Sequence, residues 1–199
     1  MSPDLHSLDL SLLPPVPRGD GDRASHFVEL YEDEGALVDS VRTFVSVGIG
    51  RGEAAVVVAT AAHRDAFEAE LSRTVDLDAA RAQGLYLSED AEETLGLFMH
   101  DGRPDPARFE DAIGALLDRA GAAGSEVRVF GEMVAVLWAQ GNDAAALELE
   151  ALWNRLAEKR RFRLFCAYAA ATLGDGDLGA VDAIARHHSH VVLPARSDR

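Results

Sequence analysis

The sequence has a single cysteine, few aromatic residues and no long apolar run. Cys166 cannot form a disulfide within the chain, which is consistent with a reducing compartment. No apolar run approaches the roughly 20 residues that a membrane-spanning helix needs. The acidic residues Asp4 and Asp9 near the N-terminus do not fit a secretory signal. We therefore expect a cytoplasmic protein without membrane contact.

Basic residues are also scarce, since 19 Lys and Arg face 34 Asp and Glu and the net charge is -15. Such a surface repels nucleic acid and anionic lipid unless basic groups are concentrated in one place. The densest basic run, Lys159-Arg160-Arg161, fits the end of a helix, where cations are favoured. We expect no direct nucleic-acid partner.

A composition of 48% hydrophobic residues in 199 residues suits the core of one domain. Residues 1–24 carry prolines, glycines and acids without periodicity, which predicts a disordered tail or, alternatively, a short partner-docking segment. The folded domain is expected to span residues 25–194, and residues 195–199 form a C-terminal tail.

The folded part alternates between apolar strand-like runs and segments with helical periodicity. Strands are predicted at His26 to Tyr31, Ala54 to Ala59, Leu85 to Leu87, Val127 to Phe130, Phe162 to Tyr168 and Val191 to Leu193. Helices are predicted at Asp33 to Val47, Ala61 to Ser72, Ala91 to His100, Pro106 to Ala122, Met133 to Ala139, Ala144 to Lys159 and Leu178 to Arg186. Gly48, Gly50 and Gly52 are expected to end the first helix.

This alternation predicts an α/β fold with three layers, in which a mostly parallel central sheet has helices on both faces. Ligands of such sheets bind at the carboxyl ends of the strands. That rule directs attention to Tyr31 after the first strand, to the Gly131-Glu132-Met133 turn and to Tyr168.

A phosphate-binding loop is missing. Such a loop needs glycines and a lysine after the first strand, whereas this sequence has Glu32, Asp33 and Glu34 there and no lysine. Asp33 is expected to cap the following helix, and the alternative is a site for a neutral or cationic ligand. ATP hydrolysis is disfavoured, no nucleophile motif is present, and we expect no enzyme and no cofactor.

Several aromatic and polar residues are candidates for a ligand pocket. Trp138 and Trp153 either line a pocket or belong to the core, and Trp153 lies on an apolar helical stripe. Glu150 and Asn154 share a helix face with Trp153. Met133 and Glu132 follow a predicted strand, where Glu132 has either a structural or a ligand-binding role.

The remaining candidates are Cys166 and the histidines. Cys166 lies in an apolar strand, where an inert buried thiol is the default. His187, His188 and His190 are clustered, and residues 187 and 190 could share a helix face. With His26 or Cys166 they are an alternative zinc site, but no pair has a recognised metal-site spacing, so no metal is predicted.

Several motifs, in their order along the chain, resemble the MEDS domain, the methanogen, methylotroph and dichloromethane-regulator sensory domain. The resemblance runs from about His26 to about Val192. The motifs are His26 to Tyr31, Gly48 to Glu53, Gly131-Glu132-Met133, Trp138, Gly141-Asn142, Leu149 to Asn154 and Cys166-Ala167-Tyr168.

The resemblance implies a fold related to RecA/KaiC-like P-loop proteins without their nucleotide chemistry. It also implies a sensory role with small, hydrocarbon-derived ligands, and it favours His26 and His190 as polar positions near the pocket. Output would pass to a separate signalling protein, such as a kinase or transcription regulator, or through a homo-oligomer.

Two functions follow as hypotheses. In the first, the domain binds a small ligand through His26, Tyr31, Glu132, Met133, Trp138, Glu150, Trp153, Asn154, Cys166, Tyr168 and His190. In the second, it is a ligand-independent regulator that binds a kinase, an anti-sigma factor or a transcription protein. A pull-down that compares a tail deletion with mutations of the pocket residues would distinguish the two hypotheses.

Overall fold

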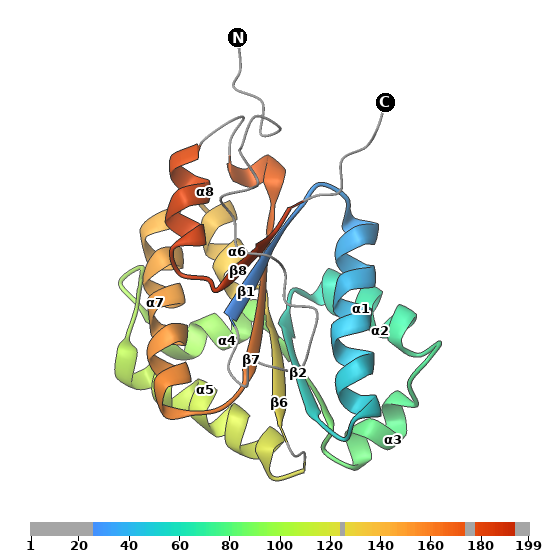
Figure 1. Cartoon of the computed structure of the whole chain (residues 1–199). Helices are drawn as coiled ribbons and strands as arrows, with labels where there is room; N and C mark the ends of the chain where they lie inside the picture. Colours follow the sequence, from blue (N-terminus) through green and yellow to red (C-terminus); the bar gives the residue numbers. More distant parts are fainter. Residues whose placement is uncertain (1–25, 124–125, 174–177, 194–199) are drawn as a thin grey trace, which may run out of the picture.

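A six-stranded parallel sheet lies between two layers of helices (Figure 1). The computed structural model describes residues 26–123, 126–173 and 178–193, so the expected tails lie outside the described residues. The strand order is β3-β2-β6-β7-β1-β8. The strands are β1 (His26–Tyr31), β2 (Ala54–Ala59), β3 (Tyr86–Asp90), β6 (Val127–Gly131), β7 (Arg163–Ala169) and β8 (His190–Val192). The predicted three-layer α/β fold is confirmed.

Each face of the sheet has its own set of helices and its own apolar cluster. The first face is covered by α1 (Glu34–Gly50), α2 (Ala61–Leu71) and α3 (Leu77–Ala82). The second face is covered by α4 (Ala91–Phe98), α5 (Pro106–Gly121), α6 (Met133–Ala139), α7 (Asp143–Lys159) and α8 (Leu178–Ala185). A 3₁₀ helix, Ala170–Leu173, follows β7. Among the helices described, none has the length and apolar character that crossing a membrane would require.

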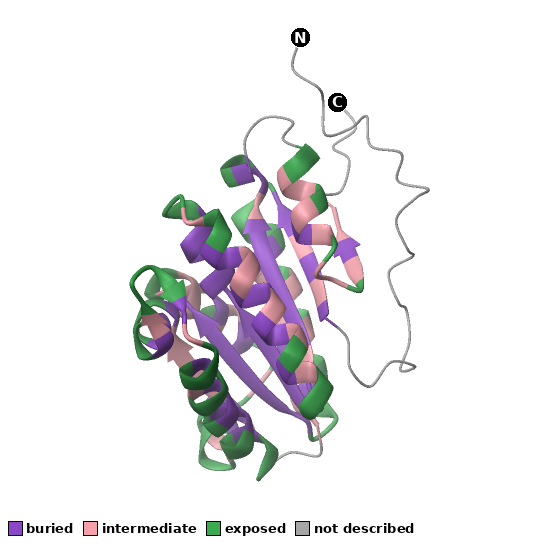
Figure 2. Cartoon of the chain, turned by 90° about the vertical axis from the view of Figure 1, so that its left-hand side faces the viewer, coloured by how far each residue is buried: buried purple, intermediate pink, exposed green. Residues whose placement is uncertain are grey.

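Strand alternation decides which side chains meet which helices. In β1, Val28 and Leu30 join the cluster under α4 to α8, whereas Tyr31 joins the cluster under α1 to α3. The central strand β2 is fully buried on both faces, as its all-apolar sequence predicts. Figure 2 shows the sheet as the buried layer of the molecule.

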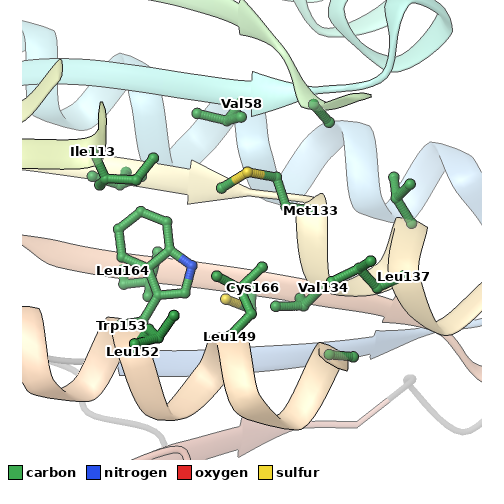
Figure 3. Packing of buried hydrophobic residues seen from close by; sticks show 14 of the residues in the cluster. Val58, Ile113, Met133, Val134, Leu137, Leu149, Leu152, Trp153, Leu164 and Cys166 are labelled. Atoms are coloured by element: carbon green, nitrogen blue, oxygen red, sulfur yellow. The ribbon is translucent and has the colours of Figure 1, made fainter. Parts of the chain in front are cut away.

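The larger cluster is organised around Trp153 of α7, whose side chain is 1% exposed. Its ring meets the rings of Phe109 and Phe162 at centroid distances of 5.2 Å and 5.8 Å. Met133 lies in the same cluster, between the sheet and α7 (Figure 3). The helical stripe therefore identified Trp153 correctly as a core residue.

Asp33 caps α1 as predicted, since its carboxylate accepts a hydrogen bond from the backbone N–H of Ala36. The helix ends within the predicted glycine segment, but it continues past Val47, through Gly48, to Gly50. Gly48 has no room for a side chain, because a Cβ there would lie 2.6 Å from Cδ of Arg128. Arg128 is buried and pairs with Glu53.

Two small elements were not predicted. The helix α3 is only six residues long, although its N-cap signal is present, since Asp76 accepts from the N–H of Ala79. In the ribbon of β4 (Met99–His100) and β5 (Arg103–Pro104), the β4 residues were wrongly predicted as the end of the preceding helix, which stops at Phe98. The turn residues of the ribbon, Asp101 and Gly102, have φ of 48° and 76°, the conformation of a tight hairpin turn.

Gly48→Ala should destabilise the protein by about 1–3 kcal/mol, because the added methyl group overpacks the buried Arg128 side chain. Gly50→Ala is the matched control, since a Cβ at Gly50 meets nothing within 4 Å. The control should be neutral or stabilising by up to about 1 kcal/mol. Urea unfolding measures both changes, and equal effects at the two positions would contradict the packing argument.

Candidate functional site

Four ionisable or metal-ligating side chains meet inside the molecule on the α7 side of the sheet. They are His26, Glu150, Cys166 and His188, called here the buried cluster, and their ligand-type atoms all lie within 4.8 Å of one another. They come from β1, α7, β7 and the link between α8 and β8. Residues more than 120 positions apart in the sequence therefore share one small volume.

The strand register brings two of these residues to the same face. Val28 of β1 pairs with Cys166 of β7, and His26 pairs with Leu164. Because side chains alternate along a strand, those of His26, Leu164 and Cys166 point to the face that α7 covers. The cluster thus lies near the amino end of β1 and the middle of β7, away from the carboxyl edge where ligands of such sheets usually bind.

Glu150 is the centre of the cluster and is 0% exposed. Its Oε1 accepts a hydrogen bond of 2.8 Å from the hydroxyl of Tyr168. Its Oε2 lies 3.2 Å from Nε2 of His26 and 3.8 Å from Sγ of Cys166. Nε2 of His188 lies 3.4 Å from Oε1, a pair in which the His188 atom has no hydrogen-bond partner among the described residues. The Glu150 carboxylate therefore has polar partners from the protein but no contact with bulk solvent.

The cluster sets the protonation states of its members. Burial raises the pKa of Glu150, but His188, His26 and the Tyr168 hydroxyl outweigh it and lower the pKa to about 2. Burial lowers the pKa of His188 to about 4, although Glu150 opposes this. Burial, and then the Glu150 charge, raise the pKa values of Cys166 and Tyr168 well above their ordinary values. At neutral pH the carboxylate is ionised and the thiol is protonated.

The His26 ring is held by residues of α7 and the chain before β8. Its Nδ1 lies 2.9 Å from Oδ1 of Asn154, and Nδ2 of Asn154 donates to the carbonyl of His187. Ser189 donates through both its backbone N–H and its hydroxyl to the His26 carbonyl, each at 2.7 Å. The position of the imidazole is therefore tied to the α8–β8 link.

A pocket of about 170 Å³ borders the buried cluster. Its walls combine aromatic and aliphatic side chains with a few polar groups. The lining residues are His26, Trp153, Asn154, Ala157, Phe162, Leu164, His187 and Ser189. His26 faces both the pocket and Glu150, so it connects the two.

A second polar group, called here the carboxyl-edge cluster, lies where β1, β2 and β6 end. Glu132 accepts from the backbone N–H of Thr60 at 2.8 Å, and its other oxygen lies 2.5 Å from Nδ1 of His63. Nε2 of His63 lies 2.6 Å from Glu34. Burial, together with the charges of Glu34 and Glu132, raises the pKa of Tyr31 above its ordinary value.

The structure divides the predicted site residues between these places. His26, Glu150 and Cys166 belong to the buried cluster, and Tyr168 donates a hydrogen bond to Glu150. Asn154 and Trp153 line the adjoining pocket. Trp138 is 8% exposed and reaches the cluster indirectly, through a T-shaped contact with Tyr168 at 5.8 Å.

The other predicted residues lie elsewhere. Tyr31 and Glu132 belong to the carboxyl-edge cluster, and Met133 is 0% exposed in the core. His190 interacts with the neighbouring Ser189 hydroxyl at 2.9 Å. The idea that residues 187 and 190 share a helix face was wrong, because α8 ends at Ala185.

Sequence reasoning missed the individual roles of His188 and His63. His188 was noticed only as one of three clustered histidines, and its role depends on α8 ending where it does. His63 lies in the first turn of α2, and its partners are 29 and 69 residues away in the sequence. The available signal was the position of His63 shortly after the end of β2, because such residues lie at the carboxyl edge of the sheet.

Tyr168→Phe should destabilise the protein by about 1.5–3 kcal/mol, because it removes a hydrogen bond to a buried, ionised carboxylate. Tyr86→Phe is the matched control, since its hydroxyl lies 3.4 Å from a carboxylate oxygen of Glu68 that is partly exposed. Its cost should be below about 1 kcal/mol. Free energies of unfolding in urea decide the matter, and equal losses would argue against an ionised Glu150.

His63 should titrate with a pKa of about 9, raised mainly by its hydrogen bond to Glu132. Because the folded pKa exceeds the ordinary value of 6.5, these ion pairs stabilise the fold fully below pH 6.5 and are lost as the pH rises through about 9. NMR titration of the imidazole protons measures this. Glu132→Gln should move the pKa back more than Glu34→Gln does, and a wild-type value near 6.5 would refute the ion pairing.

The chain was compared with known proteins. No curated protein matches it. Residues 25–189 match the sequence model of one family, described as the MEthanogen/methylotroph, DcmR Sensory domain. The matched range includes β1 to β7 and all four members of the buried cluster. Because this match covers most of the chain, the protein belongs to the MEDS family of sensory domains.

Proposed function

We propose that this MEDS domain binds a small, largely apolar molecule in the pocket beside His26 and reports its presence to a partner protein. The observation that carries the proposal is the contact between that pocket and the buried cluster through His26. A sensory domain needs a site whose occupancy can change the packing of the protein. A pocket that shares a side chain with a buried charged network meets that need.

The pocket walls indicate the chemistry of the ligand. Trp153, Phe162 and Leu164 give apolar surface, while His26 and Asn154 supply hydrogen-bonding groups. A volume of about 170 Å³ is close to the roughly 150 Å³ cavity that holds benzene in another protein. We infer a ligand of at most this size with an apolar body and at most one polar group.

The role is proposed to be non-catalytic. The loop after β1 carries Glu32 and Asp33 in place of a phosphate-binding lysine, and Asp33 is engaged as the cap of α1. Glu132 is engaged with Thr60 and His63. Cys166 is fully buried and its raised pKa keeps the thiol unreactive. These features favour binding over chemistry.

The signal is proposed to travel through the α8–β8 link. His187 and Ser189 line the pocket, and this link leads into β8, a three-residue strand at the edge of the sheet that pairs with β1. A ligand that contacts the link favours one packing of this edge, and a kinase or transcription regulator in the cytoplasm reads that packing. The acidic character of the chain, with net charge -15, suits a basic partner surface.

Ala157→Met should abolish the ligand response, because Ala157 lines the pocket and the longer side chain fills it. The wild-type protein is screened against methanol, dichloromethane and benzene by thermal shift. A probe at 100 times its Kd adds about 2.7 kcal/mol, which raises the Tm by roughly 5–10 °C in a chain of this size. Ala144→Met is the control, since Ala144 is exposed on the same helix.

Loss of the Tm shift in Ala157→Met and its retention in Ala144→Met support the proposed pocket. A shift that persists in Ala157→Met contradicts it. Capture of a partner protein that is indifferent to both substitutions and to every probe would favour the ligand-independent regulator instead.

A further inference from the structure

We propose that His26, Glu150, Cys166 and His188 bind a divalent transition-metal ion, for which Zn²⁺ fits the ligands best. This inference goes beyond the small-molecule proposal and does not depend on it. Two imidazoles, one thiol and one carboxylate are ligand types that Zn²⁺ uses, and four of them complete a tetrahedral site. The four lie on four separate elements, so a bound ion would join them.

The orientation of the His26 ring is fixed by its neighbours. Nδ2 of Asn154 donates to the carbonyl of His187, so the amide oxygen must face His26. Because that oxygen only accepts, Nδ1 of His26 carries a proton. When the ring carries this single proton, its Nε2 offers a lone pair directed at Glu150 and Cys166. This is how an outer carbonyl group usually orients a metal-ligating histidine.

His188 shows the same arrangement. Its Nδ1 lies 2.7 Å from the backbone carbonyl of Ile184, which only accepts, so Nδ1 carries the proton. Nε2 is again directed inward, 3.4 Å from Oε1 of Glu150. The His188 side chain is 0% exposed, and Nε2 has no hydrogen-bond partner within the described part of the chain. The inward Nε2 of His188 therefore offers a lone pair beside a carboxylate oxygen, which is how two ligands of one metal ion are arranged.

The spacing of the four groups suits a metal ion. Bonds of about 2.0–2.3 Å place tetrahedral ligand atoms about 3.3–3.8 Å apart. Nε2 of His26 lies 3.4 Å from Sγ of Cys166 and 3.2 Å from Oε2 of Glu150. Sγ and Oε2 are 3.8 Å apart, and the four ligand atoms all lie within 4.8 Å of one another. Tyr168 holds Oε1, which leaves Oε2 as the ligand oxygen.

Charge balance supports the same conclusion. A divalent ion with a Cys166 thiolate, the Glu150 carboxylate and two neutral imidazoles is electrically neutral. Binding releases the thiol proton to solvent. A neutral complex is the arrangement that a site without solvent tolerates best.

The test uses the full chain in two measurements. Protein from zinc-supplemented medium is dialysed against a weak chelator and its metal content is measured, with one zinc per chain expected. The metal-free protein is then titrated with Co²⁺ without oxygen. A thiolate-to-cobalt charge-transfer band and strong visible absorption of a tetrahedral ion should both saturate at one equivalent. This signature needs no variant.

Variants locate the ion. Cys166→Ser should remove the charge-transfer band, and His188→Ala should weaken zinc binding by at least about 100-fold, since even outer partners of metal ligands are worth 10–100-fold. Asn154→Ala should weaken it by about 10-fold through loss of the His26 orientation. His190→Ala and His63→Ala are the controls, because neither side chain belongs to the buried cluster, and both should keep wild-type affinity.

Wild-type protein without stoichiometric metal and without the cobalt charge-transfer band would overturn the proposal, leaving a proton-linked network. Zinc affinity unchanged in both Cys166→Ser and His188→Ala would overturn it as well, because the ion would then be bound elsewhere. Failure of small-molecule probes to raise the Tm bears only on the pocket and leaves this result unaffected.

Discussion

The structure depends on an ionised carboxylate that is buried without water. Glu150 is 0% exposed, and an isolated charge in that position would be too costly to keep. It is tolerated because β1, β7 and the α8–β8 link each bring a polar side chain to it. These contacts with Glu150 also fix the positions of β1, β7 and the link relative to α7. Loss of any one contact leaves a partly unsatisfied charge in the core, so the pieces are coupled.

The same contacts hold the small edge strand β8 against the sheet. β8 has only three residues, of which Val191 is buried in the larger apolar cluster. It is held through Ser189, which bonds to the His26 carbonyl, and through His188 in the buried cluster. His26 thus contacts the pocket, the buried cluster and the residue that precedes β8.

Much of the framework was predictable from the sequence, because it depends on local patterns. The all-apolar run of β2 and the Asp33 cap of α1 follow from burial and capping rules alone. The helix α1 ends in the predicted glycine segment at Gly50. The close approach of Gly48 to Arg128 could not be predicted, because Arg128 lies 80 residues further along the chain. Helical spacing was enough to predict that Glu150 and Asn154 share a helix face with Trp153. His188 could not be selected from its neighbours, since its role requires the end of α8 and the register of three other elements.

The central claim is that Glu150 is ionised while fully buried. Infrared difference spectroscopy of wild type against Glu150→Gln, with deuterium exchange to assign the bands, observes this group directly. The account predicts a carboxylate band for Glu150 at neutral pH that persists on acidification until the pH approaches about 2 or the protein unfolds. A protonated carboxyl band at neutral pH would contradict it, because a neutral Glu150 could neither hold the two histidines nor serve a metal ion.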